Sequence, residues 1–408
     1  MNIKSINKNS IFNNESYVIF ISAISYSLQY NPLFLYNFLW LKYWEGSSLR
    51  TLISIIGLIL CSININFKNI RFNYLILKVV FFLISFCLYG VFVGFVINGN
   101  IKLILAESSF YLELSSYLII FSLINKNRLE SLAKYIILYT GISNIISLFI
   151  FFIKYDSIVV RALTINNKII SRLVDFISPY TLILINLKNY FNNKIKYFLT
   201  IIFSITIILG SFRSIWIALL FTFILIKLIY LPKNRNPIKF IFSICVIFIS
   251  ILSIEYFLNS YFNIPGYILP RISDFIPAIL VRISQSNQIL VTLLSNKITF
   301  FIGNGFGKLS EFTNDFGFGP ITTKQPLATL SNYYIVLLGQ FGILGSSIFL
   351  SLIIKFLISC KSYLESKNSI VIISLITYLG FLSLTFPNFS HFPIAFILGL
   401  FINISLKK

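Results

Sequence analysis

Long apolar runs of about twenty residues recur along this chain of 408 residues, and they constrain its fold more than any motif does. A run of that length allows a helix to cross a bilayer core of about 30 Å. Hydrophobic residues make up 57% of the chain and charged residues only 11%, proportions that a water-soluble globular domain does not reach. The sequence therefore predicts an all-α polytopic membrane protein, with a single membrane domain over residues 1–408.

The apolar runs predict about twelve membrane spans. They lie near residues 17–39, 49–65, 73–97, 102–125, 132–153, 173–187, 238–258, 331–358, 369–386 and 392–406, with two more inside 195–231. The stretch 195–231 is too long for one crossing, and we expect a tight turn at Gly210 and Ser211 to divide it. The span at 173–187 contains Pro179 and is the shortest. No small-residue cleavage site follows the first run, so we expect no removable signal peptide.

Positive charge marks one side of the predicted membrane domain. The formal net charge is +21, but the cations stand in ones to threes between apolar runs, unlike the single basic face of a nucleic-acid-binding protein. Short cytoplasmic connections are enriched in Lys and Arg, and twelve spans place the alternate connections that carry most of the cations on one side. Their cations are Lys4, Lys8, Lys68, Arg71, Lys126, Arg128, Lys134, Lys188, Lys194, Lys196, Lys233, Arg235, Lys239, Lys355, Lys361, Lys367, Lys407 and Lys408. Both termini are therefore predicted to be cytoplasmic.

Residues 259–330, between the ninth and tenth predicted spans, form the only long segment that is not membrane-like. The charge pattern places this segment outside the cytoplasm as one large loop. It contains Gly303-Asn304-Gly305-Phe306-Gly307, called the glycine run below. Glycines also simply allow a turn before a helix, and no following GK[ST] makes this run a nucleotide-binding loop. If the protein performs chemistry, we expect it in this segment and the charges that face it.

The connection 154–172 carries more cations than its predicted side explains. Lys154, Arg161, Lys168 and Arg172 stand there against one acid, Asp156, on the side where cations are normally sparse. An anionic partner would account for all four. The alternative for any one of them is a long side chain that reaches the lipid headgroups.

Arg213 lies inside a hydrophobic stretch, in the segment ILGSFRSIW of residues 208–216. An ionisable residue in such a place is costly and is a functional candidate by default. An arginine in an interfacial turn is the alternative. Because the guanidinium group is planar and permanently charged, it can bind two phosphate oxygens at once, which suits a diphosphate held near the membrane surface.

A second motif follows the glycine run. Asn332 and Tyr333 open the tenth predicted span, and Gly342-Ile343-Leu344-Gly345 lies inside it. This order resembles the signature of the bacterial O-antigen polymerase and O-antigen ligase superfamily, the Wzy and WaaL proteins. The ILGSFRSIW segment is similar to the small-Ser-x-Arg turn of that superfamily, and Arg282 stands where its second loop arginine is expected.

The resemblance implies a metal-independent membrane glycosyltransferase of the GT-C type, without a cofactor. Its substrates would be oligosaccharides carried by undecaprenyl diphosphate at the periplasmic face of the bacterial inner membrane, for O-antigen of lipopolysaccharide or a related surface polysaccharide. A chain-length regulator is a further candidate partner. Ligases of the superfamily carry a functional histidine in the large loop, and residues 259–330 contain none, which favours a polymerase.

The candidate site residues follow from the charges and from this resemblance. Arg213 and Arg282 are the catalytic candidates, as cations for the leaving diphosphate. Candidates for binding the diphosphate or sugar are Arg161, Lys168, Arg172, Gly303, Gly305, Asn332 and Tyr333. A base for the acceptor hydroxyl could be Asp274, Glu311, Asp315 or the single histidine, His391, although acids in a solvated loop mostly serve solubility and an interfacial turn is the alternative for the histidine.

Two other functions remain as alternatives. An O-antigen ligase would share the fold, and a flippase for lipid-linked repeat units would share the twelve spans. A flippase needs polar residues within the bundle and two similar halves, whereas charges inside the predicted spans are sparse. The main examples are Lys78, Glu107, Glu113, Asp175 and Glu255. The four cysteines have no CxxC spacing and the outer loop has no Asp-x-Asp pair, so we expect neither disulfides nor a metal site.

Overall fold

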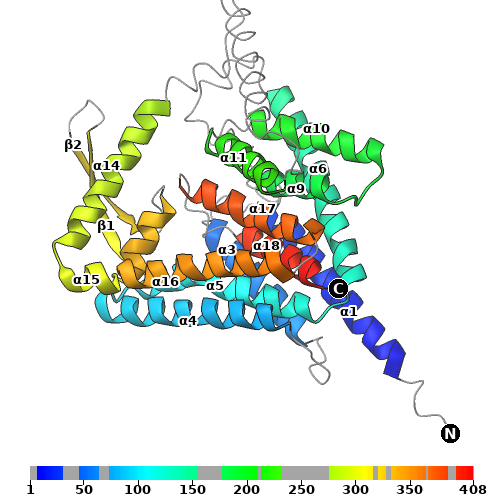
Figure 1. Cartoon of the computed structure of the whole chain (residues 1–408), viewed down its shortest axis with the longest axis horizontal. Coiled ribbons are helices and arrows are strands. Elements are labelled where there is room, and N and C mark those ends of the chain that lie inside the picture. Colours follow the sequence, from blue (N-terminus) through cyan, green and yellow to red (C-terminus); the bar gives the residue numbers. More distant parts are fainter. Residues whose placement is uncertain are drawn as a thin grey trace, which may run out of the picture.

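The structure, a computed structural model, describes residues 7–30, 46–63, 73–154, 177–209, 213–230, 275–315, 320–327, 332–363, 366–384 and 392–407. These residues are mostly helical (Figure 1). Residues 259–330 are called the outer segment below. The helices before it are α1 (Asn7–Tyr30), α3 (Gly46–Ile63), α4 (Tyr74–Ile97), α5 (Ile101–Ser122), α6 (Lys126–Lys154), α9 (Ser178–Leu187), α10 (Asn193–Leu209) and α11 (Arg213–Tyr230). The remaining elements are α14 (Phe275–Leu294), α15 (Lys297–Ile302), β1 (Leu309–Asp315), β2 (Pro320–Pro326), α16 (Tyr333–Tyr363), α17 (Ser366–Ser383) and α18 (Phe392–Leu406).

Four helices in the described part of the chain are long and apolar enough to cross a membrane. They are Tyr74–Ile97, Ile101–Ser122, Lys126–Phe149 and Tyr333–Ser362. Four shorter apolar helices accompany them, at Ser178–Leu187, Ile215–Ile226, Asn368–Ser383 and Ile394–Leu406. This confirms the prediction of a mostly helical chain with helices able to span a membrane, while the count of twelve spans remains a prediction.

Several predicted span boundaries can be compared with the helices. The stretch 195–231 contains two helices, because α10 ends at Leu209 and α11 begins at Arg213. Trp216 of α11 donates its indole N–H to the carbonyl oxygen of Ile207 in α10, at 2.9 Å. Helix α9 has only ten residues, or about 15 Å, which is half of a bilayer core. The predicted span 238–258 lies outside the described residues.

The core of the bundle is built around α18, whose residues from Ile394 to Leu406 are all buried. Helix α18 packs along α5, where Gly399 allows close approach to Tyr117. Asn403 of α18 donates its side-chain amide to the carbonyl oxygen of Leu118, at 3.1 Å. Helix α4 packs against α5 as well. A helix that is apolar on all sides belongs in the middle of a bundle, which accounts for the position of α18.

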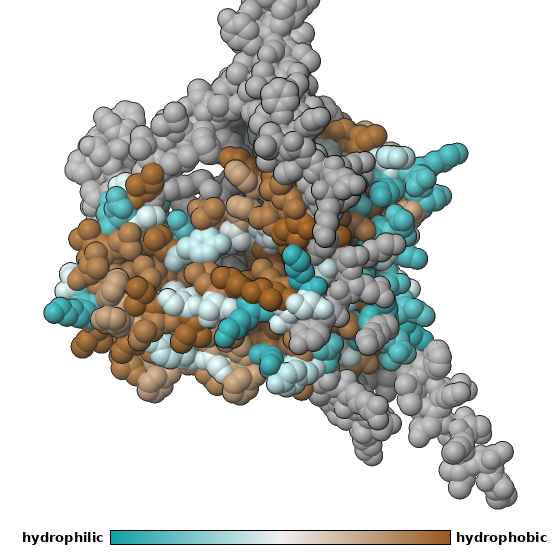
Figure 2. All heavy atoms as spheres, in the orientation of Figure 1, coloured by the Kyte–Doolittle hydropathy of each residue, from teal (hydrophilic) through white to brown (hydrophobic). Residues whose placement is uncertain are grey.

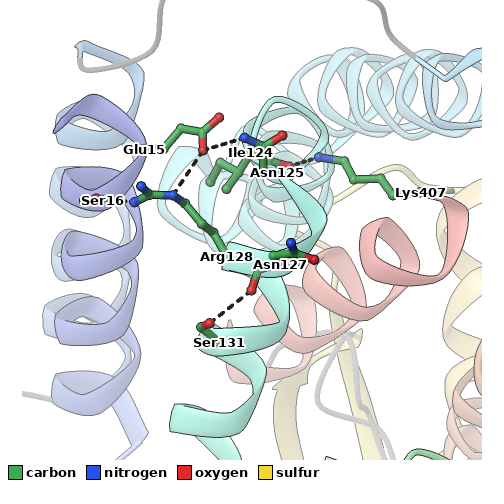
Figure 3. Close-up of polar contacts among 8 residues, drawn as sticks. All are labelled: Glu15, Ser16, Ile124, Asn125, Asn127, Arg128, Ser131 and Lys407. Carbon is green, nitrogen blue, oxygen red and sulfur yellow. Dashed lines mark hydrogen bonds and ion pairs between the residues drawn. The ribbon is translucent and has the colours of Figure 1, made fainter. Parts of the chain in front are cut away.

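One end of the bundle is held by a polar cluster that joins three distant segments (Figure 3). The Arg128 side chain pairs with Glu15 of α1, with 3.4 Å between Nε and Oε2, and it also donates to the Ser16 hydroxyl. Asn125 donates to the same Glu15 oxygen at 3.1 Å. Lys407 Nζ donates to the carbonyl oxygens of Phe121 and Ile124, which lie where α5 ends. The cluster therefore fixes α1, the α5–α6 connection and the C-terminal segment at one end of α5.

The described part of the segment 259–330 is not an irregular loop. It consists of α14, the short helix α15, the glycine run and a two-stranded antiparallel hairpin in which Leu309 pairs with Pro326 and Asp315 with Pro320. The hairpin is an exception to the predicted all-α fold. Figure 1 shows α14 running across the end of the bundle, at a steep angle to α4 and α16.

The half-buried amine of Lys407 makes the stability of the protein depend on pH. Burial lowers the pKa of Lys407 from 10.5 to about 8, while Glu15 acts in the opposite direction. Between these two values the unfolded chain binds more protons than the folded chain, so this residue makes stability rise with pH in that window. We expect the melting temperature in detergent to rise less over this window in Lys407→Met than in the wild type. Lys361→Met, at an exposed lysine of α16, serves as the control and should leave the slope unchanged.

Candidate functional site

The glycine run lies between α4 and α16, at the end of α5 opposite to the Lys407 cluster. Its backbone is hydrogen-bonded to both helices. The Phe306 amide donates to the carbonyl oxygen of Gly90 in α4, at 2.9 Å. The amides of Asn304 and Gly305 donate to the carbonyl oxygens of Gly339 and Gln340 in α16, at 2.8 and 2.9 Å. The run therefore connects the outer segment, after α15, to two long apolar helices.

Glycine is required here because the backbones touch. Gly305 has a φ of 67°, and a Cβ atom on it would overlap the Gly94 nitrogen of α4. Gly303 has a φ of 87°, and a Cβ atom there would overlap the Gln340 carbonyl group. Helix α16 is interrupted at Gly342, with a φ of 64°, where a side chain would meet the Phe301 carbonyl oxygen. Only residues without Cβ tolerate both this conformation and this proximity.

All five amides of the glycine run already have protein acceptors. Besides the three contacts above, the Gly303 amide donates to Thr299 and the Gly307 amide donates to Oε2 of Glu107, at 2.8 and 3.0 Å. The amides are thus not available to cradle a phosphate in this conformation. The contribution of Gly303 and Gly305 to a substrate site would be the shape of the chain and not their N–H groups.

Glu107 of α5 is the acid that the structure brings to the glycine run. Its Oε2 accepts hydrogen bonds from the Gly307 amide and from Nε2 of Gln340, at 3.0 and 2.8 Å. Its other oxygen, Oε1, is buried and has no hydrogen-bond partner among the described residues. A carboxyl group with one anchored oxygen has a second oxygen that can accept a further hydrogen bond or a proton.

Sequence reasoning assigned no role at the site to Glu107, which appears above only as a charge inside a predicted span. The sequence did contain one signal of a functional role for Glu107, because an ionisable residue inside an apolar helix is energetically costly. Its partner Gln340 is 233 positions away, so no local pattern could have joined the two residues.

Tyr333 is linked to the glycine run through Tyr111, whereas Asn332 bonds within its own helix. The hydroxyl groups of Tyr333 and Tyr111 are 2.5 Å apart, and both residues are buried. The Tyr111 ring lies against the ring of Phe306, with 5.7 Å between the centroids. The Asn332 side-chain oxygen accepts the amide of Tyr334 at 3.1 Å and so caps the start of α16. The Asn-Tyr motif therefore has a structural role in this conformation.

The remaining candidate residues are described only in part. Arg213 is the first residue of α11, Arg282 lies within α14, and Glu311 and Asp315 lie in β1; the structure describes the backbone of these four and not their side chains. Outside the described residues lie Arg161, Lys168, Arg172, Asp274 and His391. Among the predicted residues, the structure thus packs Gly303 and Gly305 against α16 and links Tyr333 to Phe306 through Tyr111, while Asn332 caps α16.

Within the described ranges, no three His, Cys, Asp or Glu side chains gather in a way that could hold a metal ion. Comparison of the chain with protein-family models, with curated proteins and with solved structures finds no match. The geometry around the glycine run and the motifs described above are therefore the basis for a functional assignment.

The backbone contact at Gly305 can be tested with a matched pair of glycines. Gly99 and Gly305 both have a positive φ, of 64° and 67°, but a Cβ atom on Gly99 would meet nothing within 4 Å. Alanine in this conformation costs about 1–2 kcal/mol at either position. Gly305→Ala adds an overpacking cost of about 1–3 kcal/mol. We expect a clearly lower melting temperature for Gly305→Ala than for Gly99→Ala, and equal values would contradict the docking of the run.

The anchoring role of Glu107 predicts different effects for two substitutions. Glu107→Ala leaves the buried donors of Gly307 and Gln340 without an acceptor, at a cost of about 1–3 kcal/mol for each. Glu107→Gln retains one oxygen for both donors. Thermal unfolding in detergent should show a large loss of stability for the alanine variant and a smaller loss for the glutamine variant. Equal losses would show that the carboxyl group does not hold the glycine run.

Proposed function

We propose that the chain is a polymerase of polysaccharide repeat units, which joins oligosaccharides carried by undecaprenyl diphosphate at the outer face of the bacterial inner membrane. One observation carries the proposal. The glycine run, Tyr333 and the Gly342 break, which carry the resemblance to the O-antigen polymerase superfamily, meet at a single end of the helical bundle. The run packs directly against Gln340 and Gly342 of α16, so these motifs form one packed unit.

The location also suits the reaction. The glycine run contacts the first turns of α5, whereas Lys407 and Glu15 lie at the last turns of the same helix. This separation supports a protein whose termini are on the cytoplasmic side and whose site is on the periplasmic side. A lipid-linked oligosaccharide would present its diphosphate at that level of the membrane.

The proposed reaction needs cations and a base. The hydroxyl group of an acceptor sugar attacks the anomeric carbon of the donor, and the lipid diphosphate leaves with the bonding electrons. Arg213 and Arg282 are assigned to the leaving phosphates, because a guanidinium group binds two oxygens and remains charged. Arg161, Lys168 and Arg172 add positive charge on the predicted outer side. Glu107 joins the earlier candidates as a carboxyl group near the glycine run.

A deletion strain tests the function directly. The bacterium that carries this gene would be analysed for surface lipopolysaccharide by gel electrophoresis, with and without the gene restored on a plasmid. A polymerase predicts that the deletion leaves one repeat unit on the core. A bare core with long chains stored on the lipid carrier would instead indicate a ligase, and a bare core with repeat units retained inside would indicate a flippase.

The same strain tests the two arginines. Restoring the gene with Arg213→Ala or Arg282→Ala should give no ladder beyond one repeat, because losing one donor to the developing negative charge costs a factor of about 10²–10³ in rate. Lys297→Ala, which removes an exposed cation of the same outer segment, is the matched control and should restore a normal ladder. Each variant must be present in the membrane fraction at wild-type amounts. Normal ladders from both arginine variants would contradict the assigned phosphate-binding role.

A further inference from the structure

Helix α14 presents three different faces. Ile289 and Leu293 are buried against the rest of the protein. Gln288 and Thr292 lie on a polar face, and the Thr292 hydroxyl donates to the Gln288 carbonyl oxygen. Ile283, Val291 and Leu294 lie on a third face, which also carries the exposed Asn287, and their exposed fractions are 49%, 67% and 61%. A helix that served only as a water-exposed lid would have no need for the third face.

The exposed apolar face continues beyond α14. Ile298, Phe301 and Ile302 of the following helix α15 are exposed as well. The Tyr89 hydroxyl of α4 donates to the Ile302 carbonyl oxygen at 2.7 Å, so α15 lies directly beside α4. Figure 2 shows hydrophobic residues gathered around α15 and the adjoining end of α14, and further hydrophobic residues along α4.

The surface of α4 identifies what covers this face. Helix α4 is one of the four helices able to cross a membrane, and its exposed residues include Phe92 and Phe95. Large aromatic side chains exposed on a spanning helix lie against lipid. The exposed face of α15 begins where that of α4 ends, so the same lipid extends to it.

The direction and composition of α14 fit the membrane surface and not a further crossing. Figure 1 shows α14 across the ends of α4 and α16, which is the direction of a helix parallel to the membrane plane. Its middle is the polar run Ser284-Gln285-Ser286-Asn287-Gln288, which a spanning helix would have to bury in lipid. Lys297 stands exposed at the start of α15, where a cation can reach lipid headgroups.

We infer that α14 and α15 lie in the membrane interface on the side of the glycine run, with Ile283, Val291, Leu294 and Ile298 in the acyl-chain region. The polar face of α14, with Gln288 and Thr292, faces water. Such interfacial helices enter the boundary between headgroups and acyl chains by about 5–10 Å. The partner is the lipid bilayer itself, and the inference does not depend on the proposed polymerase activity.

Fluorescent labelling tests the position of each face. Single cysteines would replace Leu294, Ile298 and Thr292 in the full-length protein, carry an environment-sensitive nitrobenzoxadiazole label and be reconstituted into phosphatidylcholine–phosphatidylglycerol vesicles. The described native cysteines Cys61, Cys87 and Cys360 are buried, which limits their labelling. The unsubstituted chain, treated in the same way, measures the fluorescence that arises from native cysteines. Phe92→Cys on α4 is the lipid-facing control.

The inference predicts a contrast within one helix. Labels at Leu294 and Ile298 should be quenched by spin-labelled phospholipids and protected from iodide, as at Phe92, whereas the label at Thr292 should be quenched by iodide. Iodide quenching at Leu294 and Ile298 equal to that at Thr292 would overturn the inference, because both faces would then be in water. Protection from both quenchers would also overturn it and would indicate contact with protein.

A second measurement needs no substitution. The wild-type protein, reconstituted with a photoreactive phospholipid, would be irradiated and digested, and the modified residues identified by mass spectrometry. Lipid adducts within residues 291–302 would support the inference. Adducts on α4 without any within 291–302 would overturn it.

Discussion

The close contact between the glycine run and two spanning helices is the interaction on which the outer part of the structure depends. Backbone atoms of the run meet Gly90 and Gly94 on α4 and Gly342 on α16. Without side chains at these points the backbones can approach closely, so every amide of the run is hydrogen-bonded although the run is buried. The positions of α15, β1 and the start of α16 follow from this contact.

Helix α5 connects this contact to the opposite end of the bundle. Near the first turns of α5, Glu107 holds the glycine run. In the last turn of α5, the carbonyl oxygen of Phe121 binds Lys407. Glu107 and Phe121, whose carbonyl oxygen binds Lys407, are 14 positions apart in α5, or about 21 Å along the helix. One helix thus carries a polar anchor near each end, and the buried Glu113 lies between them.

The outer segment is where the structure differs most from the sequence-based prediction. A search for apolar runs found nothing membrane-like in 259–330, because α14 alternates three faces and has a polar middle. Averaging along the sequence removes such a pattern, whereas the structure separates the buried, polar and exposed apolar residues. Asn332 shows a similar effect: its position in a motif suggested substrate binding, and the structure shows it capping α16.

The sequence by itself determined the membrane class, the position of most helices and the division of 195–231 into two helices. Hydropathy is a local property, and a helix satisfies its backbone hydrogen bonds within its own segment, so both can be read along the chain. Tertiary structure alone decided which segments meet. The pairing of Glu107 with Gln340, of Tyr111 with Tyr333 and of Lys407 with the end of α5 joins residues more than 200 positions apart. These contacts arise from packing between helices, which a linear pattern of apolar residues does not encode.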